Sequence, residues 1–158
     1  MTVGAAVTRE LLRDEKNTVD ELAADLDWAV DAALDDLVMT VTMESQLDSE
    51  VYLVELECTN YDEEPPYVEM IHPDTGERGV PAAYFDDRGT SPNLCYPKGP
   101  AWCHQFNRKL YQDTNAHNDW SMAAWKREAG DYTTLGSILL LLYRRMNDPE
   151  SYQGRLQA

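Results

Sequence analysis

The stretch NLCYPKGPAWCH, residues 93–104, gathers side chains whose types are suited to chemistry. It holds two of the three cysteines in the chain, Cys95 and Cys103, and one of the three histidines, His104. Asn93 adds an amide that is able to donate hydrogen bonds. Because a thiolate is both a nucleophile and a zinc ligand, the stretch raises three hypotheses: a nucleophile site, a metal site, or a packed corner of the domain.

The metal hypothesis uses four residues with the spacing C-x7-C-H-x12-H: Cys95, Cys103, His104 and His117. All four are residue types that zinc prefers, although the pattern lacks the close C-x2-C or H-x3-H pairs that often chelate the ion. A bound zinc ion would explain how an irregular loop is held without a core of its own. In this interpretation the Cys95 thiolate binds the metal and is poorly available as a nucleophile.

The other two hypotheses concern the exposure of Cys95. Pro97, Gly99 and Pro100 predict that Cys95 lies in a loop. The neighbouring Lys98 would favour the thiolate, which is the reactive form of a cysteine. Free cysteines are often buried, so a Cys95 that packs beneath the loop is the structural alternative.

The hydrophobic pattern predicts the elements that position these residues. After a polar segment, residues 1–17, Thr18 and Glu21 fit a capping box, and helical spacing of apolar residues continues to Leu34. Period-two alternation then predicts strands over residues 37–45, 51–61 and 67–71. Short turns between them favour an antiparallel meander. Cys58 is expected to lie on the inward face of a strand and to have a structural role.

Residues 72–130 form a long irregular region that contains every candidate site residue, and long ordered loops are usually functional. Four aromatic side chains are expected to pack as a satellite core beneath it: Trp102, Tyr111, Trp120 and Trp125. A closing helix over residues 131–146 is capped by Thr133 or Thr134 and would lay its leucines on the sheet. We expect residues 1–158 to form a single domain.

The composition restricts the class of protein. The 158 residues are 43% hydrophobic, and 29 acidic residues against 13 basic ones give a net charge of -16. Such a surface repels nucleic acid and anionic membranes, so neither is expected as a partner. Lysine is scarce and aspartate abundant, a bias typical of proteins from salt-loving archaea, whose cytoplasm screens acidic repulsion.

The sequence also indicates the compartment. The first residues lack the basic and apolar regions of a signal peptide. The longest apolar run, residues 138–142, is too short to span a bilayer. An odd number of cysteines does not make a disulfide framework. We therefore expect a soluble cytoplasmic protein with reduced thiols.

Three segments in this order resemble the ubiquitin-conjugating enzymes. NYDEEPPYVEMIHP is similar to that family's double-proline crossing, strand and His-Pro, PNLCYPKGPAW to the segment around its active cysteine, and TTLGSILLLLY to the helix that follows. The family has an Asn directly after His-Pro, whereas here Asp74 follows Pro73, and Cys95 lies 22 residues beyond Pro73. The segment between Trp102 and Thr133 is longer than in the eukaryotic enzymes, and in this respect the chain is more similar to divergent prokaryotic members.

The resemblance implies an α+β fold of the ubiquitin-conjugating or RWD type, with an N-terminal helix, a three- to four-stranded antiparallel meander, a long active-site loop and a C-terminal helix on the sheet. It implies that Cys95 accepts a ubiquitin-like modifier as a thioester, from an activating enzyme, and passes it to an amine. Asn93 is the nearest amide to stabilise the oxyanion. No cofactor is implied. The alternative is a non-catalytic, zinc-binding adaptor of the same fold.

The acidic, lysine-poor surface predicts that stability depends on salt. Screening relieves repulsion between like charges, so the thermal midpoint should rise as KCl increases from about 0.1 to about 2 M. A series of thermal melts measures this directly. Midpoints that stay flat or fall over that range would contradict the salt-adapted interpretation.

Overall fold

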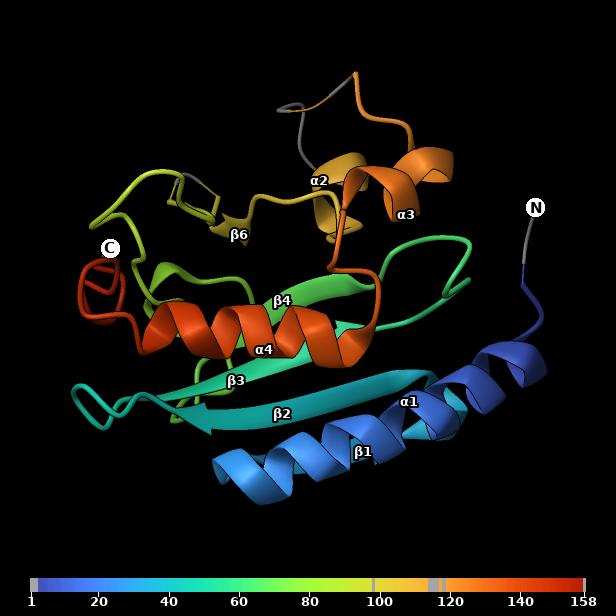
Figure 1. The fold of residues 1–158 in the computed structure, drawn as a ribbon, viewed down its shortest axis with the longest axis horizontal. Coiled ribbons are helices and arrows are strands. Elements are labelled where there is room, and N and C mark those ends of the chain that lie inside the picture. Colours follow the sequence, from blue (N-terminus) through green and yellow to red (C-terminus); the bar gives the residue numbers. More distant parts are fainter. Residues whose placement is uncertain (1–2, 98, 114–116, 118, 158) are drawn as a thin grey trace.

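The computed structural model describes residues 3–97, 99–113, 117 and 119–157. It has an α+β fold with an N-terminal helix, a four-stranded antiparallel sheet and a C-terminal helix (Figure 1). This confirms the general class and order of elements expected from the sequence. Among the described residues, no helix has the length and apolar character needed to cross a membrane.

Helix α1 spans Ala5–Leu26, so the predicted start at Thr18 is wrong. The segment taken for a polar extension is amphipathic, with Leu12 and Thr8 buried on its inner side. The Thr8 hydroxyl donates to the Tyr61 carbonyl oxygen at 3.0 Å. Thr18 lies in mid-helix against α4, where a Cβ placed on Gly136 would come within 3.5 Å of its methyl group.

The chain leaves α1 earlier than its apolar spacing predicts. Asp27 adopts a left-handed conformation with φ of 62°, and its N–H still bonds to the Ala23 carbonyl. Strand β1, Ala29–Ala33, and a 3₁₀ turn, Leu34–Asp36, follow in place of the predicted last helical turns. The side chains of this edge strand alternate between exposed and half-buried. Over so few residues, the apolar positions fit the spacing of a helix as well as that of a strand.

The sheet is a meander in the order β1-β2-β3-β4, with β2 at Val38–Glu44, β3 at Val51–Glu57 and β4 at Tyr67–Ile71. Val54 lies opposite Val41 on one side and Met70 on the other. One face is buried, as the alternation predicted, through Met39, Val41, Met43, Tyr52, Val54, Leu56, Val68 and Met70. Cys58 is also fully buried, which confirms its inward position.

Helix α4, Leu135–Met146, covers this buried face (Figure 1). Of the two predicted caps, Thr134 is the one used: its hydroxyl accepts from the Ser137 N–H, and the Ser137 hydroxyl accepts from the Thr134 N–H. The Glu15 carboxylate of α1 accepts from the Leu135 N–H at 2.8 Å and so ties the two helices together. Burial raises the pKa of Glu15.

The described part of the irregular region contains two short strands, β5 at Cys95–Tyr96 and β6 at Ala101–Trp102, and two single-turn helices, α2 at Lys109–Gln112 and α3 at Trp125–Glu128. Two more 3₁₀ turns span Pro81–Ala83 and Met122–Ala124. Of the predicted satellite core, Trp102 and Trp125 are fully buried, whereas Tyr111 and Trp120 are half-exposed. The Trp102 ring packs on Phe85 with centroids 4.5 Å apart.

The cap of α4 gives a test of the fold. Thr134→Ala removes the side-chain acceptor at the helix start and should lower the free energy of unfolding by about 1 kcal/mol. Thr133→Ala, one residue earlier, removes a hydroxyl that does not cap the helix and should change it by less than about 0.5 kcal/mol. Denaturant titrations of both variants measure the difference, and equal losses would contradict the assigned cap.

Candidate functional site

The candidate residues lie on the β5–β6 hairpin, and the pairing of its strands decides which way each side chain points. Cys95 lies directly opposite Trp102. One position further along, the Cys103 N–H donates to the Leu94 carbonyl oxygen at 2.7 Å. Because successive residues of a strand face opposite sides, Cys95 and Trp102 face one side of the hairpin, and Leu94 and Cys103 face the other.

Cys95 faces the protein core. Only 3% of its surface is exposed, and its neighbour Trp102 packs on the aromatic rings of Tyr84 and Phe85. Burial, and to a lesser extent the nearby acidic side chain of Asp87, raise the pKa of the Cys95 thiol to about 12. The thiol is therefore protonated near neutral pH. The sequence allowed either an exposed loop cysteine or one that packs beneath the loop, and the second is observed. Lys98 lies outside the described residues.

Asn93 lies two residues before Cys95, and its amide takes part in a hydrogen bond within the hairpin. The Asn93 Nδ2 donates to the carbonyl oxygen of Cys95 at 2.9 Å. In this arrangement the amide stabilises the backbone of the hairpin. This hydrogen bond uses one of the two N–H donors of the amide, so an oxyanion at Cys95 would have to be bound by the other one.

A buried carboxylate, which sequence reasoning missed, holds the hairpin in place. Asp87 has no exposed surface, and its two oxygens accept from the N–H groups of Leu94 and Cys95 at 2.8 and 2.9 Å. The Arg145 guanidinium of α4 lies 4.0 Å from the same carboxylate. In a chain with 29 acidic residues, nothing in the sequence marks Asp87 as the buried one.

Cys103 and His117 are in contact. The Cys103 Sγ lies 3.0 Å from the His117 Nε2, and the imidazole stacks flat on Trp120, with ring centroids 3.6 Å apart. Cys103 is half-buried, and this burial raises the pKa of its thiol. The predicted zinc set already contained this pair of residues, but the sequence did not indicate that they meet as a pair.

His104 has a separate environment. Its ring stacks on Phe106 and meets the edge of Tyr132, and its Nδ1 accepts from the Phe106 N–H at 3.2 Å. Burial lowers the pKa of His104 to about 4, so the ring is neutral at pH 7. It therefore contributes packing and a neutral imidazole to the site.

The four residues of the predicted zinc set are not gathered around one point. Cys95 and Cys103 face opposite sides of the hairpin, and only Cys103 and His117 of the set make a side-chain contact that the described residues reveal. Within those residues, no three His, Cys, Asp or Glu side chains are positioned to hold a metal ion. Zinc binding stays a prediction.

A cavity of about 240 Å³ lies between the hairpin and α4, on the side that Cys103 faces. Its walls combine apolar and polar side chains: Pro92, Asn93, Leu94, Cys103, His104, Tyr132, Leu141 and Arg145. Cys95 is not part of this lining, because it points to the other side of the hairpin. Of the two thiols on the hairpin, Cys103 is the one that lines this cavity.

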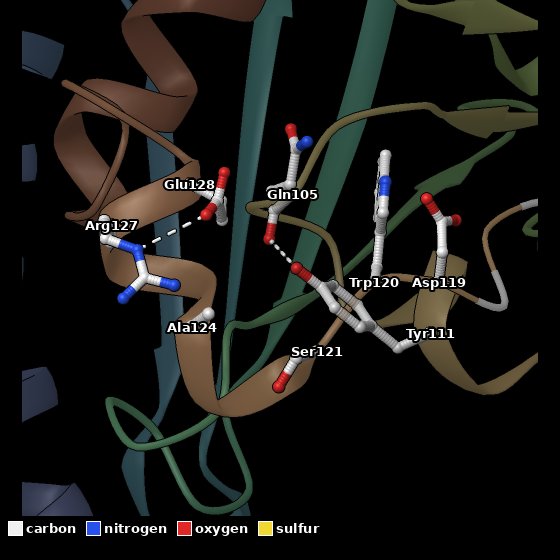
Figure 2. Close-up of a pocket in the computed structure, with 8 residues that line it drawn as sticks. All are labelled: Gln105, Tyr111, Asp119, Trp120, Ser121, Ala124, Arg127 and Glu128. Atoms are coloured by element: carbon white, nitrogen blue, oxygen red, sulfur yellow. Dashed lines mark hydrogen bonds and ion pairs between the residues drawn. The ribbon is translucent and has the colours of Figure 1, made fainter.

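A second pocket, of about 410 Å³, lies next to the Cys103–His117 pair. Figure 2 shows Tyr111 and Trp120 on one side of it and Arg127 with Glu128 of α3 on the other. The Tyr111 hydroxyl donates to the Gln105 carbonyl oxygen at 3.0 Å. Trp120 thus lines this pocket and also carries the stacked imidazole of His117.

Comparisons with protein-family models, curated proteins and solved structures return no match for this chain.

The Asp87 carboxylate gives a stability test of the site. Asp87→Ala leaves two buried N–H groups without an acceptor, so the free energy of unfolding should fall by about 2–4 kcal/mol. The matched control is Asp86→Ala, which removes a partly exposed ion pair with Arg88 and should cost less than about 1 kcal/mol. Denaturant titration measures both, and a loss for Asp87→Ala no larger than for the control would contradict the assigned role.

Proposed function

We propose that this chain is a carrier of the ubiquitin-conjugating type, which accepts a ubiquitin-like modifier as a thioester on Cys95 and passes it to an amine. The observation that carries the proposal is the arrangement of the fold. A helix, a four-stranded antiparallel meander, a long loop with Cys95 in it, and a helix over the sheet follow one another in the order that the resemblance implies. The partners are then a modifier and its activating enzyme.

The chemistry at Cys95 is an exchange of thioesters. The Cys95 thiolate attacks the carbonyl carbon at the C-terminus of the modifier, a new C–S bond forms, and the thiol of the activating enzyme leaves with a proton. Because the resting thiol is buried and has a raised pKa, loading requires a movement that exposes Cys95 and a base that removes its proton. The same burial would shield the loaded thioester from water.

A second candidate, a non-catalytic adaptor that binds the same partners, is favoured by one specific observation. Cys95 faces the core, only 3% exposed. A side chain so placed serves packing without any chemistry. In the adaptor interpretation the fold would hold a modifier or an activating enzyme on its surface, and the zinc predicted from Cys95, Cys103, His104 and His117 would be structural.

A loading assay separates the two candidates. Incubated with activating enzyme, ubiquitin-like modifier and ATP from the same organism, the carrier should give a conjugate that a thiol reductant removes. Cys95→Ser should give a reductant-resistant oxygen ester or no conjugate. Asn93→Ala should load normally and discharge to lysine about 10²-fold more slowly if the amide stabilises the oxyanion.

Cys58→Ser and Cys103→Ser are the matched controls and should load like the natural chain. A reducible conjugate that persists in Cys95→Ser would show that another cysteine carries the modifier. If no conjugate forms, and the unmodified modifier still binds the chain in a pull-down, the adaptor replaces the carrier.

A further inference from the structure

The hairpin separates two thiols with different surroundings. Cys95 points into the core, whereas Cys103, one position beyond the residue that pairs with Cys95, borders the 240 Å³ cavity. A side chain that reacts with a small molecule must border a space that the molecule can enter. Cys103 meets this condition.

Cys103 also has a base in contact. The distance of 3.0 Å between Cys103 Sγ and His117 Nε2 is that of a hydrogen bond, and stacking on Trp120 fixes the plane of the imidazole. A thiol and an imidazole within hydrogen-bond reach, with the imidazole oriented by a third group, form the arrangement that activates cysteine nucleophiles.

We propose that Cys103 and His117 form a nucleophilic thiol–imidazole pair that accepts a short acyl group from a small thioester entering the cavity. This activity goes beyond the carrier function proposed for Cys95 and does not depend on it. The size of the cavity suits a short acyl chain and excludes a folded modifier. Its apolar wall of Leu94, Leu141 and Pro92 suits the acyl chain, and Arg145 and Asn93 supply polar groups at the cavity wall.

The proposed step balances without an oxidant or a cofactor. His117 Nε2 takes the proton of the Cys103 thiol as the sulfur attacks the carbonyl carbon of the thioester. A C–S bond to Cys103 forms, the original C–S bond breaks, and the departing thiolate takes the proton back from the imidazolium. The products are S-acylated Cys103 and a free small thiol.

Alkylation with iodoacetamide, followed by peptide mapping, tests the pair in the natural chain and needs no partner protein. Cys103 should react at least about tenfold faster than the buried Cys58 and Cys95. Exposure alone would give this order, so the decisive comparison is His117→Gln. Loss of the base should slow alkylation of Cys103 by about tenfold or more, while His72→Gln, a histidine outside the site, should leave it unchanged.

The acyl step is tested with an acetyl thioester of a small thiol as the probe. Intact mass and peptide mapping should find one acetyl group on Cys103, and a thiol assay should find one released thiol for each acetyl group bound. Cys103→Ser should abolish both signals, and His117→Gln should slow them by about tenfold or more. A thermal melt of each variant confirms that it is folded.

Three results would overturn the proposal: alkylation of Cys103 that is as fast in His117→Gln as in the natural chain, acetylation that falls on a residue other than Cys103, or no acetylation. If a chelator accelerates alkylation of Cys103, the thiolate holds a metal ion. The interpretation as a zinc site would then replace the interpretation as a nucleophile. Failure here leaves the carrier assay untouched, because that assay is read on Cys95→Ser with Cys103 intact.

Discussion

The site depends on the two hydrogen bonds that the buried Asp87 carboxylate accepts from the N–H groups of Leu94 and Cys95. Taking a carboxylate out of water costs several kcal/mol. Two charge-assisted hydrogen bonds and the Arg145 guanidinium 4.0 Å away offset that cost. Because the carboxylate holds two successive amides, it fixes where β5 begins, and so it fixes which of its side chains enter the core.

Asp87 is itself held by segments that are far apart in the sequence. The C-terminal segment pairs with the chain just before Asp87, through the Leu156 N–H on the Tyr84 carbonyl and the Gln153 N–H on the Asp86 carbonyl. On the other side, Tyr84 and Phe85 pack against Trp102 of β6. The C-terminal segment therefore holds the chain segment that contains Tyr84, Phe85 and Asp87, and this segment in turn orders the short strands of the hairpin.

The sequence predicted what local periodicity encodes and missed what depends on tertiary contacts. Alternation in β2 to β4 and the inward Cys58 follow from neighbouring residues, and both are confirmed. The sequence offered Thr133 or Thr134 as the cap of α4, and Thr134 is the one used. The true start of α1 at Ala5 was missed because its inner face is polar at Thr8, whose hydroxyl bonds to Tyr61. At the site, the proximity of Asn93 to Cys95 was predictable. The burial of Asp87 and the contact of Cys103 with His117 could not be predicted, because the residues involved lie in a loop region that has no periodic pattern.

Alternation along a strand also links the two thiols. A shift of β5 by one residue past β6 turns every β5 side chain to the opposite face. Cys95 would then leave the core and face the cavity, on the side where Cys103 meets His117. The Asp87 carboxylate opposes this shift, because its two hydrogen bonds define the present register. A carrier that exposes Cys95 in this way must therefore first break the two hydrogen bonds of Asp87.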